Sequence, residues 1–236
     1  MSSHRWGTAP DFVGPRHELR ERLLLDLLLS ANPGSRVLDA GAGQGTMSRR
    51  LLKRGFDVTS TDVSPEAVEV LRERLGERVL AADLTDLPFE DASFDAAVLG
   101  EVLEHVEDDA AALREVRRVL RPGGALAVSV PGNPARFGPS DRWAGHHRRY
   151  TRPELFEKVA AAELAVTRCV AWGFPVSALY HRHVYERYVG RQGATQPRRR
   201  RQRPALALLA ALLQLDRLFV GVERGSLGYL LLARRP

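Results

Sequence analysis

Three aspartates in the first half of the sequence each lie at the end of a short apolar run. Asp39 ends the first run, Asp62 ends the second, and Asp83 follows the third. The segment Gly41-Ala42-Gly43-Gln44-Gly45 comes just after the first of these acids, and a helical pattern begins at the next residue. Glycines permit positive φ angles and let a ligand lie against bare backbone. The stretch therefore predicts a ligand-binding turn between a buried strand and a helix.

The spacing of the glycines and the position of the first acid indicate the kind of ligand. The glycines occur as G-x-G-x-G rather than as the dinucleotide fingerprint G-x-G-x-x-G, and Asp39 lies two residues before Gly41. A carboxylate there would repel a pyrophosphate and attract an ammonium or sulfonium group. Asp62, at the end of the next strand, is placed to accept hydrogen bonds from both ribose hydroxyls, and Asp83 can meet an adenine amino group. The pattern favours S-adenosylmethionine over a dinucleotide.

Any one of these acids alone is typical of an ordinary strand end or helix cap, but three in succession favour a binding function. Further motifs are Phe94-Asp95, residues 101–105 and Leu120-Arg121-Pro122-Gly123-Gly124. With these motifs, residues 36–130 resemble the class I S-adenosylmethionine-dependent methyltransferases, in particular the small-molecule type with a methyltransferase type 11 or quinone-biosynthesis-like core.

The resemblance implies roles for individual residues. For the methionine part of the cofactor, it implies that Gly41, Gly43 and Gly45 line it and that Asp39 faces its ammonium. For the nucleoside part, it implies that Asp62 holds the ribose with Val63 beside it, and that Asp83 and Leu84 hold the adenine. It also implies that Glu101 faces the cofactor or the acceptor.

Alternating apolar and amphipathic stretches predict an α/β fold. We expect helices over residues 16–29, 46–54, 65–75 and 108–120, strands over 36–40, 57–62, 79–82, 94–100 and 125–130, and a sharp turn over 121–124. This alternation predicts a Rossmann-like, doubly wound, mostly parallel sheet. By resemblance, strands over 165–172 and 227–233 add an antiparallel C-terminal hairpin, which makes seven strands with an inserted helical cap.

The expected organisation has four parts. They are an N-terminal arm and helix (1–35), a cofactor-binding core (36–133), a substrate lid loop and helix (134–163), and a C-terminal hairpin (164–236) that carries a basic loop and an apolar helix within 171–226.

The composition indicates which partners and which cell compartment to expect for the protein. The net charge of +6 comes from one segment, because residues 182–203 hold eight arginines against the single acid Glu186 and leave a balance of −1 for the rest of the chain. A basic groove for nucleic acid across the whole surface is therefore disfavoured. Cys169 is the only cysteine, which excludes an internal disulfide. With neither a signal-peptide pattern nor a spanning apolar stretch, we expect a cytoplasmic protein.

Residues 131–150 are where we expect the acceptor to bind, because they follow a strand end and are rich in histidine, arginine and aromatic residues. Trp143, Arg149 and Tyr150 are candidate substrate-binding residues. A hydroxyl or amine acceptor loses a proton as the methyl group moves, and a neutral imidazole suits that task near pH 7. His146, His147 and His105 are the candidate bases, although direct transfer can proceed by alignment alone. Neither His146-His147 nor His181-x-His183 has the spacing of a metal site, so no metal is expected.

These observations predict a methyltransferase that methylates oxygen or nitrogen on a small molecule, typical of natural-product or secondary metabolism. The alternatives are a lipid or quinone acceptor at a membrane surface, an RNA acceptor held by the arginine segment including Arg198–Arg203, and a non-catalytic cofactor-binding partner protein. The apolar residues 204–220 fit a pocket-covering helix, a homodimer seam or peripheral membrane contact.

Overall fold

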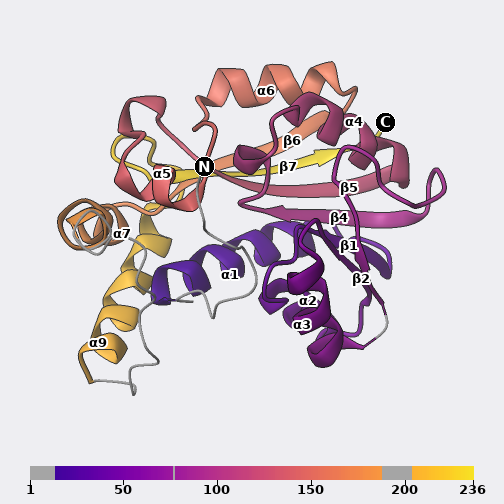
Figure 1. The fold of residues 1–236 in the computed structure, drawn as a ribbon. Coiled ribbons are helices and arrows are strands. Elements are labelled where there is room, and N and C mark those ends of the chain that lie inside the picture. The colour runs from indigo at the N-terminus through magenta and orange to yellow at the C-terminus, as the bar shows by residue number, and fades with distance from the viewer. Residues whose placement is uncertain (1–13, 77, 188–203) are drawn as a thin grey trace.

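A computed structural model of the chain describes residues 14–76, 78–187 and 204–236. Within them lies one sheet in the order β3-β2-β1-β4-β5-β7-β6 (Figure 1). The strands are β1 (Arg36–Ala40), β2 (Asp57–Asp62), β3 (Val79–Ala81), β4 (Phe94–Gly100), β5 (Leu120–Pro131), β6 (Ala165–Trp172) and β7 (Gly228–Arg234). β1 to β5 pair in parallel, and β7 runs antiparallel to both β5 and β6. The predicted seven-stranded sheet with an antiparallel C-terminal hairpin is confirmed.

Helices cover both faces of the sheet, so the doubly wound arrangement is also confirmed (Figure 1). One face carries α1 (Pro15–Leu29), α2 (Thr46–Leu52) and α3 (Pro65–Leu75), and the other carries α4 (Asp109–Val119) and α6 (Arg152–Ala161). Successive side chains of a strand point to opposite faces. Val37 therefore joins the core cluster under α1 and α2, while Leu38 joins the cluster under α4 and α6.

Local hydrogen bonds fix where the helices begin. The Ser64 hydroxyl accepts the backbone N–H of Ala67, with Pro65 as the first residue of α3. At α6, Thr151 accepts the N–H of Glu154 at 3.3 Å, and the Glu154 carboxylate accepts the N–H of Thr151. These side chains satisfy N–H groups that a helix start leaves unpaired. The two bonds at Thr151 and Glu154 form a capping box.

Three stretches differ from the sequence expectation. Residues 121–124 are part of β5 rather than a turn before it. The strand already pairs with β4 at Leu120, opposite Phe94, and the next pair is Ala125 with Ala96. The extra residues of β5 between these two pairs form a register shift. The region 131–150 is folded, with η2 (Pro134–Arg136) and α5 (Pro139–Ala144). The apolar helix α9 (Pro204–Leu213) ends early and continues as the 3₁₀ segment η4 (Gln214–Phe219).

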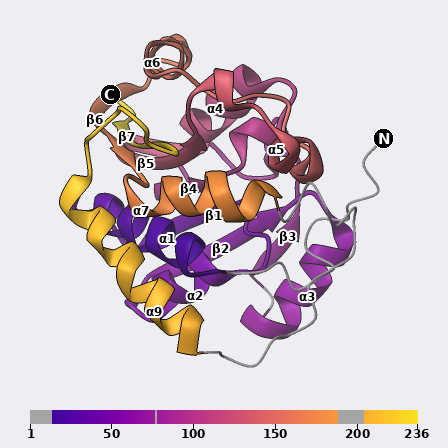
Figure 2. The same cartoon turned by 90° about the vertical axis from the view of Figure 1, so that its left-hand side faces the viewer.

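The insertion between β6 and β7 contains α7 (Val176–Tyr180), the π-helical η3 (His181–Tyr185), α9 and η4. α9 packs against α1 and α7 (Figure 2). The η3 segment reaches α1 through the Arg16 guanidinium, which lies 4.7 Å from the centre of the Tyr185 ring. The arginine segment, including Arg198–Arg203, lies outside the described residues. Among the helices that the structure describes, none has the length and apolar character to cross a membrane.

Tyr150 corrects one expectation about the acceptor site. Its side chain is fully buried, and its hydroxyl donates a 2.8 Å hydrogen bond to Asp109 Oδ2. Asp109 also pairs with Lys158 at 2.8 Å and with Arg148 at 3.0 Å. Tyr150 therefore ties α4 to the chain that enters α6, and it belongs to the core rather than to a surface that a substrate reaches.

Replacing this tyrosine tests the structural role. We expect Tyr150→Phe to lower the free energy of unfolding by about 1 kcal/mol, because one buried hydrogen bond is lost while Asp109 keeps its two cationic partners. Urea unfolding followed by circular dichroism measures this change. A variant as stable as the parent protein would contradict the role in the core.

Candidate active site

The glycine turn after β1 is in close contact with another part of the chain on one side and faces open space on the other. Gly41, Gly43 and Gly45 have φ angles of +72°, +52° and +70°, a region that favours glycine. A Cβ atom on Gly41 would lie 2.6 Å from Val102 Cγ2, whereas one on Gly43 would meet nothing within 4 Å. The Gly41 N–H donates to the Thr61 carbonyl at 2.8 Å, which ties the turn to β2. The turn is thus packed on the Val102 side and open at Gly43.

Asp62 is held in a fixed orientation at the mouth of this turn. Its two carboxylate oxygens accept the backbone N–H groups of Gly43 at 2.9 Å and Ser64 at 3.0 Å. Each oxygen of a carboxylate has room for a second hydrogen bond. The next side chain, Val63, is 69% exposed. The end of β2 therefore offers an oriented acceptor next to an apolar surface.

Asp39 lies beneath the turn and not in solvent. Its side chain is 3% exposed and accepts a hydrogen bond from the Ser48 hydroxyl, which is itself 2.9 Å from the hydroxyl of Ser60. Burial raises the pKa of Asp39 to about 7. A positive group above the turn would favour its ionised form.

The third acid, Asp83, follows β3 and is exposed. One of its carboxylate oxygens accepts both the N–H and the hydroxyl of Thr85 at 2.8 Å, and the neighbouring Leu84 is buried. Because β3, β2 and β1 are adjacent and parallel, these three acids line one edge of the sheet in succession.

A second group of titratable side chains follows β4, directly across from the glycine turn. Glu101 has a φ angle of +62°, and its Oε2 atom pairs with Arg20 Nη1 at 3.2 Å. Burial acts to raise the pKa of Glu101, but the surrounding positive groups, led by Arg20, outweigh burial and lower it. Glu101 is thus the ionised member of this group, held by a cation from α1.

Glu104, in the short helix η1 (Leu103–His105), has the opposite environment. Its side chain is fully buried, and neither carboxylate oxygen has a hydrogen-bond partner among the described residues. The Nε2 atom of His146 lies 3.9 Å from its Oε1 atom, beyond hydrogen-bond distance. Burial, followed by the charge of Glu101, raises the pKa of Glu104 well above its usual range.

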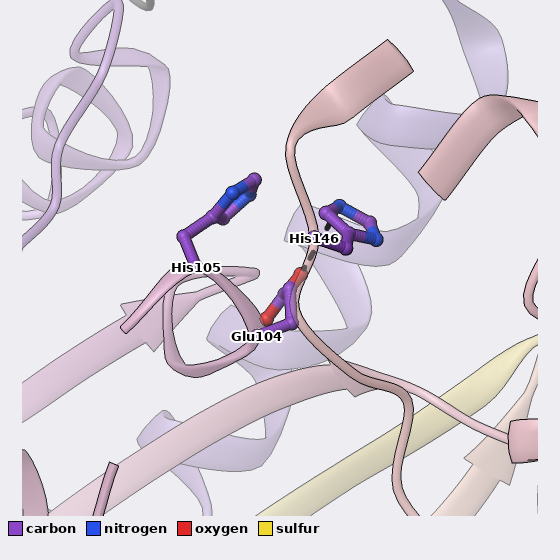
Figure 3. Close-up of side chains that lie close together, drawn as sticks. All are labelled: Glu104, His105 and His146. Carbon is purple, nitrogen blue, oxygen red and sulfur yellow. Dashed lines mark ion pairs between the residues drawn. The ribbon is translucent and has the colours of Figure 1, made fainter. Parts of the chain in front are cut away.

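His146 is oriented by a buried carboxylate. Its Nδ1 atom lies 2.8 Å from Asp141 Oδ1, and Asp141 also accepts from Arg149 Nε and from the Gly138 N–H, each at 2.8 Å. Despite burial, the bonds from His146 and Arg149 lower the pKa of Asp141 to about 2. An ionised Asp141 keeps the proton on Nδ1 of His146, which leaves Nε2 facing Glu104 (Figure 3).

The other candidate histidines have different surroundings. The His105 ring meets the His146 ring edge to face, with centres 4.6 Å apart. Burial lowers the pKa of His105 to about 4, so its ring is neutral at pH 7. His147 is exposed and is tied to the site by its backbone N–H, which donates to the Glu104 carbonyl.

The structure thus brings together His105, His146 and Glu101, whereas two of the predicted substrate contacts are buried and bonded to other residues. Tyr150 lies in the core, and Arg149 is 6% exposed and committed to Asp141. Trp143, on α5, is half-buried. Sequence reasoning missed the roles of Glu104, Asp141 and Arg20. An acid five residues before His146 could have indicated the Asp141 pair, whereas nothing in the sequence links Arg20 to Glu101.

Comparison with known proteins shows what this part of the chain is similar to. Residues 38–128 match the family model described as "Methyltransferase domain". This segment, which is less than half of the chain, is similar to a methyltransferase domain. The match covers the glycine turn, the strand-end acids and the segment 101–105, so the sequence resemblance to class I methyltransferases is confirmed over this stretch.

Curated relatives match about half of the chain. A "Demethylmenaquinone methyltransferase" of Beutenbergia cavernae is 45% identical over 117 residues, which are 49% of this chain and 48% of that protein. A "Ubiquinone biosynthesis O-methyltransferase" of Xanthomonas campestris is 37% identical over 144 residues, 57% of this chain and 60% of that protein. The matched segments therefore span between about half and three fifths of these relatives.

A solved structure resembles nearly the whole chain. The [4+2]-cyclase SpnF is 28% identical, with a TM-score of 0.61, over 92% of this chain and 80% of that chain. Because SpnF is named as a cyclase, likeness to the methyltransferase domain does not by itself define the reaction.

The environment of Asp39 predicts a pH dependence of stability. A carboxyl group whose pKa is raised in the folded state keeps a proton that the unfolded chain has lost. Its contribution to the free energy of unfolding is therefore fully present below about pH 4, and it disappears as the pH rises through about 7. We expect Asp39→Asn to remove a decline in unfolding free energy of about 2–3 kcal/mol between pH 5 and pH 7.5.

Urea unfolding at both pH values, with Asp57→Asn as the control, measures this effect. Asp57 is the first residue of the neighbouring strand β2, where it is 44% exposed and pairs with Arg78. Parallel pH profiles for the parent protein and Asp39→Asn would contradict the assigned environment of Asp39.

Proposed function

We propose that this chain is an S-adenosylmethionine-dependent methyltransferase that methylates an oxygen or nitrogen atom of a small molecule. The observation that carries the proposal is the open glycine turn flanked by the acids that end β1 and β2, inside the matched methyltransferase domain. When bound, S-adenosylmethionine supplies an electrophilic methyl group on a sulfonium centre.

The residues around the turn fit the parts of this cofactor. The open space at Gly43 leaves room for the methionine portion between Gly41 and Gly45. Asp39 would face the ammonium group, which favours the ionised form of a carboxyl whose pKa is near 7.

The strand ends beyond the turn fit the nucleoside part. Asp62 would accept the ribose hydroxyls with its remaining lone pairs. The exposed Val63 offers an apolar surface, and Asp83 with Leu84 would meet the adenine.

The acceptor would bind beside the segment that follows β4. Val102 packs on Gly41, so this segment adjoins the turn. Nε2 of His146 would accept a proton from the acceptor's hydroxyl or amine, while Asp141 holds the ring and stabilises the imidazolium that forms. The neutral His105 ring lies against His146 and excludes water from that side.

A second candidate acceptor is a quinone or another lipid at a membrane surface. Both curated relatives carry names of quinone-biosynthesis methyltransferases. The end of the insertion also exposes large apolar side chains, which suit an amphipathic contact with lipid. They are Leu208, Leu212, Leu215, Leu218, Phe219 and Val222.

Methyl-labelled S-adenosylmethionine and a fractionated cell extract test the acceptor class. We expect label in the small-molecule fraction. Label confined to the lipid fraction would favour the quinone alternative, and label confined to RNA would overturn the small-molecule proposal. Cofactor binding without any transfer of label would favour a protein that has kept the fold without methylation.

Two adjacent histidines provide a matched test of the base. We expect His146→Gln to lower turnover by about 10²–10⁴-fold, the usual contribution of a general base, without weakening cofactor binding. His147→Gln should leave turnover unchanged, because His147 is exposed. Equal effects of the two substitutions on turnover would contradict the role of His146.

A further inference from the structure

Glu104, His105 and His146 form a cluster that neither the glycine turn nor the cofactor acids require. One ligand-type atom from each residue lies within 4.8 Å of the others. Figure 3 shows the Glu104 carboxylate close to the His146 ring, which comes from a different segment of the chain, with His105 on the adjacent side. The three side chains thus converge on one point at the carboxyl end of β4.

Glu104 lacks a hydrogen-bond partner among the described residues, and its ion-pair contact with His146 is long, at 3.9 Å. Glu101 pairs with Arg20, and Asp141 pairs with Arg149 and His146. In contrast, the Glu104 carboxylate is fully buried, and neither of its oxygens has a hydrogen-bond partner among the residues that the structure describes. A buried carboxylate without a donor or a cation is costly, so this side chain points to a missing positive group.

Both histidines have the outer partners that metal-ligating histidines use. The Nδ1–H group of His146 donates to the Asp141 carboxylate at 2.8 Å, which leaves Nε2 to bind a metal ion. The His105 ring hydrogen-bonds to the backbone of Gly145. A histidine that binds a metal donates its other ring N–H to a carboxylate or a carbonyl, which fixes the tautomer and the ring orientation.

We infer that Glu104, His105 and His146 bind one divalent transition-metal ion, of the Zn²⁺ or Fe²⁺ class. Two imidazoles and one carboxylate are the ligand set of such ions in sites that keep coordination positions open. Ligand bonds of about 2.0–2.1 Å hold two tetrahedral ligand atoms roughly 3.4 Å apart. The His146 Nε2 and Glu104 Oε1 atoms, 3.9 Å apart, therefore need only a small side-chain rotation. The full set of three atoms, now within 4.8 Å of one another, must move closer together when the ion binds.

Such a site narrows the class of acceptor. The open coordination positions favour an acceptor that offers oxygen atoms, such as a phenol or a catechol. With the ion bound, His146 Nε2 would be a ligand and not a base. The ion would favour the ionised form of the acceptor hydroxyl, whose proton would pass to water. This catalytic consequence rests on the proposed methyltransferase function, whereas the binding of the ion does not.

Cobalt substitution tests the site without an activity assay. The metal-free full chain is titrated with Co²⁺, whose visible absorption reports ligand bonds, and Zn²⁺ is added in competition. We expect saturable bands at one ion per chain that Zn²⁺ abolishes. Glu104→Gln keeps the size and shape of the side chain but replaces one carboxylate oxygen with an NH2 group, which only donates hydrogen bonds. It should weaken Co²⁺ binding at least as much as loss of an outer-shell partner does, about 10–100-fold.

His183→Ala serves as the control, because His183 is exposed on η3 and lies outside the cluster. This variant should bind Co²⁺ like the parent protein, whereas His146→Ala should lose Co²⁺ binding. Circular dichroism checks that each variant is folded. Absence of saturable bands, or equal binding by Glu104→Gln and the parent protein, would overturn the site. Transfer of labelled methyl groups without Co²⁺ binding overturns the metal site alone, and Co²⁺ binding without transfer overturns only the proposed function.

Discussion

Parallel pairing of β1 with β2 on one side and β4 on the other is the constraint on which the site depends. It brings the carboxyl ends of all three strands to one edge, where the chain must turn immediately. The turn after β1 has no space for a side chain at Gly41, because Val102 from the turn after β4 occupies it. The open turn and the acid- and histidine-bearing segment are therefore packed against each other, and a shift in one displaces the other.

The acids at this edge differ in how the protein compensates for burying them. Asp62 accepts two backbone N–H groups, which fix its orientation. Glu101 and Asp141 pair with arginines, which lower the pKa of both carboxyl groups and keep them ionised. Asp39 accepts from the neutral Ser48 hydroxyl, and Glu104 has no hydrogen-bond partner among the described residues, so burial raises the pKa of both. The two incompletely compensated acids are the positions where a positive ligand gains most.

The sequence was sufficient to predict the sheet and the glycine turn because these depend on local patterns: period-2 and period-3.6 hydrophobicity, strand-end acids and a capping box at Thr151. The acceptor side could not be predicted in the same way. An aromatic residue near a strand end has the same local signature in a pocket as in the core, and long-range contact with Asp109 put Tyr150 in the core. The cluster of Glu104 with His146 likewise joins segments about 40 residues apart, so a search for metal ligands among near neighbours could not find it.

Equilibrium binding of methyl-labelled S-adenosylmethionine to Asp62→Ala and Asp57→Ala tests the central claim, that the carboxyl edge of the sheet holds the cofactor. The two acids lie at opposite ends of the same strand, β2. The account predicts that Asp62→Ala weakens binding by about 10–150-fold, the value of a hydrogen bond to a charged group, and that Asp57→Ala binds like the parent protein. Unchanged affinity in Asp62→Ala, or an equal loss in both variants, would contradict it.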